Sequence, residues 1–274
     1  MRIKHILRRM SAVVMMLTLS VSLIACGGKD DGGGLSSKKK TSYTLSEYMK
    51  KDDLQIWYIG GIDKDREYKA IIFKGGKCTY VGSAVTKESK YPTLGDAAQA
   101  TDEEIYAALL EAYQTYYDSQ MAYYKEVVDK KEQYDWEDCE KKYNNLIGRD
   151  VSDFIYYDYL ISVEADKTGN NTEEEMFTYY QDGDLYYYYG GVECGYDIKP
   201  YNTVQGQVYD SYYKGFEMYE SAGDMSGDRP FFTRVDSSEI TISVDTPTTK
   251  GVLVDKTKDE IRDMLKEKLG IKDN

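Results

Sequence analysis

Apolar runs bounded by turn residues predict the first part of a β-sheet. Residues 54–59 (LQIWYI), 68–74 (YKAIIFK) and 77–81 (KCTYV) are rich in β-branched and aromatic side chains. Gly75-Gly76 separates the last two runs, and this pair favours a two-residue hairpin because the primed turn types need positive φ. We therefore predict a three-stranded meander over residues 54–82.

Apolar doublets at helical spacing follow the meander and predict a long helix over residues 102–131. Thr101 and Glu104 form a capping-box pattern at its start, with acidic residues in the first turn that suit the helix dipole. Asp135 is placed to cap a second helix that runs through Ile147. The two helices together form a helical hairpin inserted between two β regions.

Strand patterns return in the second half of the chain. Residues 152–165 and 172–181 flank the polar loop 166–171 (DKTGNN), and Asp182-Gly183 predicts a hairpin into residues 184–189 (DLYYYY).

The remaining elements complete the prediction of an α+β fold. Strands are predicted at residues 203–209, 231–236 and 239–244, and a capping box at residues 257–260 opens a C-terminal helix that ends at Gly270. The fold class is therefore α+β, a mostly antiparallel β-sheet with an inserted long helical hairpin and a C-terminal helix.

Residues 1–25 have the three parts of a lipoprotein signal peptide. A basic start precedes an apolar stretch over residues 12–24, and Leu23-Ile24-Ala25-Cys26 ends it. This tetrapeptide resembles the lipobox of bacterial lipoproteins, which implies cleavage before Cys26 and a diacylglyceryl group on its sulfur. The apolar run is shorter than the ~20 residues that span a bilayer, whereas two acyl chains suffice for stable anchoring. We expect a protein that is lipid-anchored on the extracellular face of the cell membrane.

The chain after the signal peptide divides into a tether and a folded domain. Residues 26–42 contain the lipidated cysteine and a Gly-, Ser- and Lys-rich stretch without apolar periodicity, which is typical of a flexible tether. Residues 43–274 form the extracellular α+β domain, and a sub-boundary near residue 150 stays open. The membrane is thus a partner through the anchor on Cys26.

Composition excludes several classes of function. The leader carries four basic residues and no acidic one, so the chain without it has a formal net charge of −17, which repels nucleic acid. The single histidine, His5, lies in the leader, so His-based triads and His-ligated zinc are excluded. Cys78, Cys139 and Cys194 form no CxxC pair and are either three buried thiols or a disulfide with one thiol left over. No cofactor is expected.

Tyrosine is unusually frequent, with 29 Tyr against 6 Phe. Tyrosine suits positions where one ring edge packs and the hydroxyl reaches water. The rings either cover sheet faces or form a surface that stacks on sugars or grips a peptide. The candidates for such a ligand surface are Tyr186, Tyr187, Tyr188 and Tyr189.

Calcium is a weak candidate ligand, and no other metal site is indicated. Asp166, Thr168 and Asn170 begin a calcium-loop pattern, but Asn171 stands where an EF-hand needs Gly and Phe177 where it needs Glu. A nonstandard calcium site and a simple Asx/Gly turn both remain open for this loop.

Paired carboxylates are the catalytic route left by the missing histidine. The sequence does not rank the acids that would form such a pair, among them Asp158, Glu164, Asp184 and Glu193.

Short stretches over most of the mature chain resemble uncharacterised surface lipoproteins of low-GC Gram-positive bacteria. These stretches are IWY (56–58), TLGD (93–96), TGNNT (168–172), VYDSYYKGF (208–216) and DTPTTKGVLVD (245–255). The resemblance implies an anchored surface protein and transfers no catalytic residue.

Two functions remain open from the sequence. The first is a non-enzymatic binding or interaction module with a glycan, peptide or protein ligand. The alternative is a histidine-free, carboxylate-based hydrolase that acts on glycans or wall fragments.

Overall fold

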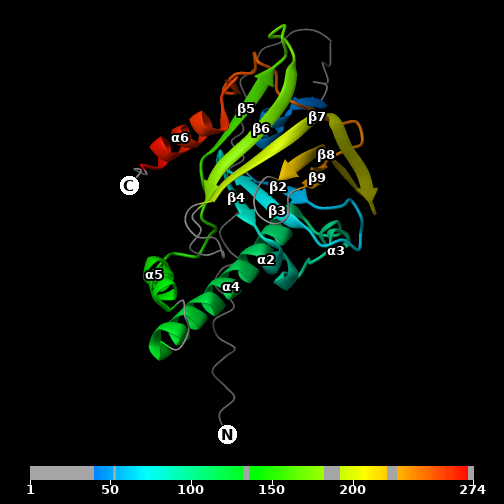
Figure 1. Cartoon of the computed structure of the whole chain (residues 1–274). Coiled ribbons are helices and arrows are strands. Elements are labelled where there is room, and N and C mark those ends of the chain that lie inside the picture. Colours follow the sequence, from blue (N-terminus) through cyan, green and yellow to red (C-terminus); the bar gives the residue numbers. More distant parts are fainter. Residues whose placement is uncertain (1–39, 52–53, 132–135, 182–191, 221–226, 271–274) are drawn as a thin grey trace, which may run out of the picture. The chain divides into compact units, whose positions relative to one another are not determined.

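The meander predicted for residues 54–82 is part of a nine-stranded, mostly antiparallel sheet (Figure 1). The computed structural model describes residues 40–51, 54–131, 136–181, 192–220 and 227–270, and residues 40–274 form one compact unit. The strands are β2 (Leu54–Ile59), β3 (Lys69–Lys74), β4 (Lys77–Val81), β5 (Tyr159–Ala165), β6 (Thr172–Gln181), β7 (Val192–Val208), β8 (Ser211–Glu220), β9 (Gly227–Val235) and β11 (Leu253–Val254). Their order is β11-β5-β6-β7-β8-β9-β2-β3-β4, with only β11 parallel to its neighbour.

The sheet curls until its two margins meet. Cys78 in β4 exchanges backbone hydrogen bonds with Tyr157, two residues before β5, at N···O distances of 2.9 and 2.7 Å. Side chains meet across the same closure, since the ring of Phe73 in β3 lies 5.3 Å from Tyr159 and 5.4 Å from Phe177, centroid to centroid. Strands β2 to β9 therefore surround a common interior.

Two cores lie on the two faces of this sheet. All eight strands β2 to β9 contribute to the inner core, through Trp57, Phe73, Cys78, Ile161, Phe177, Ile198, Phe216 and Phe231. The outer core forms where helices cover β2, β3 and β9, through Ile56, Tyr58, Ile72, Phe232, Leu94, Ile105 and Leu109. Strand β2 is therefore buried on both faces, because consecutive side chains alternate between the two cores.

The three longest helices lie where the sequence predicts them, and the described residues form three short helices in addition. They are α1 (Leu45–Met49), α2 (Ser83–Glu88), α3 (Leu94–Ala97), α4 (Asp102–Lys130), α5 (Trp136–Leu146) and α6 (Lys258–Leu269). Helices α4 and α5 form the predicted hairpin, in which the hydroxyl of Tyr117 donates to the carbonyl of Leu146 at 2.6 Å. Figure 1 shows α4 beginning beside β2 and β3, while α6 packs on β5 and β6.

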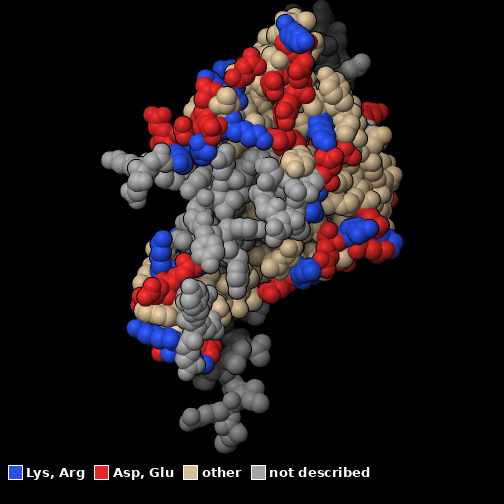
Figure 2. Space-filling view, in the orientation of Figure 1, with Lys and Arg blue, Asp and Glu red and all other residues tan. Residues whose placement is uncertain are grey.

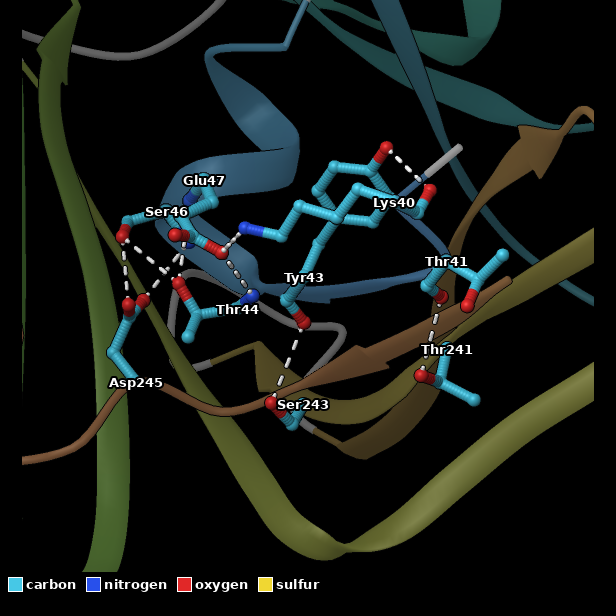
Figure 3. A network of polar contacts seen from close by, with 9 residues as sticks. All are labelled: Lys40, Thr41, Tyr43, Thr44, Ser46, Glu47, Thr241, Ser243 and Asp245. Carbon is cyan, nitrogen blue, oxygen red and sulfur yellow. Dashed lines mark hydrogen bonds and ion pairs between the residues drawn. The ribbon is translucent and has the colours of Figure 1, made fainter. Parts of the chain in front are cut away.

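The N-terminal segment of the domain is held by residues 241–245, which lie far along the chain. Strand β1 (Ser42–Thr44) pairs in parallel with β10 (Thr241–Ser243), and α1 then buries Leu45, Tyr48 and Met49 in the inner core. Figure 3 shows Ser46 facing Asp245, whose carboxylate accepts from the Ser46 backbone N–H at 2.9 Å and from its hydroxyl at 2.6 Å. Because Ser42 belongs to β1, the range assigned to the tether, residues 26–42, overlaps the first strand by one residue.

The α+β prediction is confirmed in its main parts. The capping boxes at Thr101 and Thr257 form as predicted, and both glycines of the Gly75-Gly76 turn have positive φ, +58° and +76°. Cys78 and Cys139 are buried in different cores, which fits buried thiols, while the side chain of Cys194 lies outside the described residues. No helix within the described ranges is both long and apolar enough to cross a membrane.

Candidate functional site

Several predicted site residues lie outside the described residues. These are the lipidation candidate Cys26 and the ligand-surface candidates Tyr186, Tyr187, Tyr188 and Tyr189. Their assignments stay predictions.

The calcium candidates lie together in the loop between β5 and β6, but their oxygens face protein donors. Asp166 Oδ1 accepts from the hydroxyl of Thr168 at 2.6 Å and from the backbone N–H groups of Thr168, Asn170 and Asn171 at 3.1 to 3.3 Å. Its Oδ2 accepts from Asn171 Nδ2 at 2.7 Å. These hydrogen bonds, first from Thr168 and then from Asn171, hold the pKa of Asp166 far below its usual value. This geometry is that of an Asx turn closed by Gly169, whose φ is +72°.

Calcium is expected to leave the thermal stability of this protein unchanged. The Asp166 carboxylate already accepts N–H and O–H donors, so a cation would have to displace them. The measurement is the melting temperature after EDTA treatment and after addition of excess calcium. A rise of several degrees that disappears in Asp166→Ala would show that the loop binds calcium after all.

An open groove on the outer face of β6, β7 and β8 is the best candidate for a ligand site. It has a volume of about 420 Å³, and the residues that matter most in its lining are Glu173, Glu174, Asp197, Lys199, Tyr201 and Tyr219. We call it the Tyr201 groove, because Tyr201 is 80% exposed and Tyr219 is 37% exposed. Large exposed aromatic rings beside polar groups are typical of binding surfaces.

A bulge in β7 places Tyr201 in the groove. The pairing of β7 with β8 shifts between Ile198 and Thr203, so residues 199–202 stand against the single residue Glu217. Two contacts fix the bulge, since Asn202 Nδ2 donates to Glu217 Oε2 at 2.7 Å and Lys199 Nζ donates to Asp228 Oδ1 at 2.6 Å. The tyrosine ring is therefore presented from a backbone tied to both β8 and β9.

The groove carries an excess of negative charge. Asp197 forms an ion pair with Lys258, the first residue of α6, at 3.0 Å. The direct cross-strand neighbour of Asp197 is Tyr219 in β8. Within the described part of the chain, Glu173 and Glu174 form no ion pair. Burial, followed by the charge of Asp197, raises the pKa of Glu174, although Lys258 lowers it.

Glu174 also lines a second hollow of about 390 Å³, which lies on the side of β6 that adjoins β5. This hollow is bordered by Glu164, Met176, Asp255 and Lys256, and Glu164 is paired across the strands with Glu174. Figure 2 shows acidic side chains gathered over β5, β6 and α6, with a few lysines among them. Within the described ranges, no group of three or more His, Cys, Asp or Glu side chains is arranged to hold a metal ion.

The sequence prediction missed most of this site. Of these residues, only Glu164 is among the acids that the sequence indicates, while no sequence pattern marks Glu174, Asp197 or Tyr201. Pro200 was the signal available, because proline inside a strand pattern marks an edge or a bulge. Asp184 lies outside the described residues, and so does the side chain of Glu193.

Comparison with known proteins gives no further indication of the family or the ligand. No protein-family model, no curated protein and no solved structure matches this chain.

Proposed function

We propose that this protein is a membrane-anchored cell-surface lipoprotein whose domain acts as a non-enzymatic binding module. The observation that carries the binding role is the exposed Tyr201 ring in an open groove of about 420 Å³. The lipobox-like sequence at residues 23–26 supports the anchoring. A shallow aromatic groove suits recognition of a flexible surface ligand better than enclosure of a reacting substrate.

Cys26→Ser is expected to release the protein from the membrane. The sulfur of Cys26 is the only atom in the lipobox that can carry the thioether, so without it the two acyl chains are lost. The measurement is detergent phase partitioning after expression in a bacterium that processes lipoproteins. The wild-type chain should enter the detergent phase, and the variant should remain in the aqueous phase. An unmodified wild-type chain in the aqueous phase would contradict the anchoring.

The binding role is tested with the soluble chain that starts at Gly27. Its melting temperature is measured against wall muropeptides, oligosaccharides and short peptides. A ligand at ~100 times its dissociation constant adds ~2.7 kcal/mol to the free energy of unfolding, which raises the melting temperature by several degrees. A rise with one class of ligand supports the module, and no rise with any of them contradicts it.

A carboxylate hydrolase is the second candidate, because Glu174 has a raised pKa and lies beside Asp197 in one groove. Glycosidases use two carboxyl groups, one of which has a raised pKa and acts as the general acid. Turnover of a bound oligosaccharide that is lost in Glu174→Gln would favour this alternative over the binding module.

A further inference from the structure

We propose that the Tyr201 groove binds an extended peptide segment through a lysine or arginine side chain. This inference rests on the proposed binding function and names its ligand class. Three features of the groove carry it: its charge, its exposed rings and the bulged backbone of β7.

The charge of the groove favours a cation. Lys199, which lines the groove, is already paired with Asp228 at 2.6 Å, and the lining carboxylate of Asp197 is already paired with Lys258 of α6 at 3.0 Å. Glu173 and Glu174 therefore give the groove its unbalanced charge among the described residues. An ammonium or guanidinium group that approaches either carboxylate would form charge-assisted hydrogen bonds, whereas an anionic ligand would be repelled.

The exposed rings add a second reason for a cation. Tyr201 is 80% exposed and Tyr219 37% exposed, and both border the same groove as the two glutamates. A cation over the face of a tyrosine ring is attracted by its quadrupole, and the stem of a lysine or arginine packs against the ring. Carboxylates and rings together select a long basic side chain.

The backbone of the bulge favours a peptide over a free amine. Residues 199–202 of β7 have no Cα partner in β6 and stand against Glu217 alone in β8, so in the described structure they bulge out of the regular register. An extended peptide can form main-chain hydrogen bonds with such a stretch while its side chains enter the adjoining groove. A free amine would use the carboxylates alone.

Binding of a cation is expected to depend on pH through Glu174. The groups that face this carboxyl are Glu164 from β5, Asp197 from β7 and Lys258 from α6. Because its pKa is raised, Glu174 ionises at a higher pH than an exposed glutamate does, and the affinity for a cation rises through that range.

The test uses the chain from Gly27 and the peptide acetyl-(Gly-Lys)₃-amide, followed by NMR shifts of ¹⁵N-labelled protein. We expect a dissociation constant of about 1 mM or tighter, with shifts at residues 173–174 and 197–202. Acetylation of the lysine side chains, Tyr201→Ala and Glu174→Gln should each weaken binding about tenfold or more. Raising the NaCl concentration from about 20 to 300 mM should also weaken it.

Two control variants separate the groove from the general charge and aromaticity of the surface. Tyr209→Ala removes a 54% exposed tyrosine at the turn between β7 and β8, and Glu111→Gln removes an exposed acid on α4. Both should keep the wild-type affinity. Equal losses in Tyr209→Ala and Tyr201→Ala, or unchanged affinity for the acetylated peptide, would overturn the inference.

The outcomes for this inference and for the proposed function are distinguishable. If the peptide does not bind but oligosaccharides or muropeptides raise the melting temperature, the binding module stands and the basic-peptide site is wrong. If an oligosaccharide is turned over and the peptide does not bind, both are wrong and the hydrolase is favoured.

Discussion

Gly215→Ala is expected to lower the free energy of unfolding by about 3 kcal/mol or more. Gly215 lies in β8 opposite Phe232 of β9. A Cβ at this position would lie 2.5 Å from the Cα of Phe232 and even closer to the carbonyl oxygen of Phe231. Both neighbours are backbone atoms of a central strand, so neither can move aside without separating β8 from β9.

The matched control for this substitution is Gly61→Ala. A Cβ on Gly61 would meet only the Cγ of Arg66, at the ordinary contact distance of 3.6 Å, so we expect a change within about 1 kcal/mol. Urea unfolding of both variants gives the free energies, provided that the slope m is unchanged. Equal stability of the two variants would show that the strands can separate at Gly215 without cost.

Local signals in the sequence predict the three longest helices and the short hairpin well. Helix α4 begins at Asp102 after the Thr101 cap, and its apolar doublets repeat at helical spacing, so its bounds depend on residues within a few positions of each other. The turn at Gly75-Gly76 is equally local, because positive φ is a property of the glycines themselves.

Closure of the sheet was not predictable from such signals. The bridge between Cys78 and Tyr157 joins residues on either side of the whole helical hairpin, and no local pattern marks that pairing. Strand β8 was also not predicted, since the turn before it contains Tyr209 rather than Gly or Asn. Tyr209 adopts φ +51° there, a conformation that a bulky residue rarely takes.

The candidate site was beyond sequence reasoning for a related reason. Glu174 and Asp197 meet because β6 and β7 pair in one register, and Tyr201 is exposed because four residues of β7 bulge out. Glu173, Glu174 and Glu175 read as one acidic run, yet Glu175 points into the interior while Glu174 lines the groove. Successive side chains of a strand point to opposite faces, so the acidic run alone does not show which glutamate is buried and which lines the groove.

The buried carboxyl of Glu175 is expected to make the stability of the fold depend on pH. Glu175 is 0% exposed, and its Oε2 accepts from the backbone N–H of Asp245 at 2.9 Å. Burial, then the charge of Asp245 and a side-chain hydrogen bond with it, raises the pKa of Glu175 well above its usual value. Folding therefore takes up a proton at any pH between the unfolded and the folded pKa.

The sign of the effect follows from that proton uptake. The contribution of Glu175 to stability is complete below its unfolded pKa of about 4.3, and it is lost as the pH rises toward the folded pKa. The loss amounts to about 1.4 kcal/mol per pH unit in that range. Glutamine has a similar shape and takes up no proton, so Glu175→Gln should become more stable relative to the wild type as the pH rises.

Urea unfolding of both proteins at pH values from 5 to 8 measures this difference directly. The difference in unfolding free energy should change in favour of the variant as the pH rises, by about 1.4 kcal/mol per pH unit until the folded pKa of Glu175 is reached, while Glu173→Gln, an exposed neighbour on β6, should show little change. A difference that stays constant from pH 5 to 8 would mean that Glu175 has the same charge in the folded and unfolded chains. Glu175 would then be a buried carboxylate beside Asp245. Asp245 joins Ser46 of α1 to Glu175 of β6, so this contact would hold two negative charges.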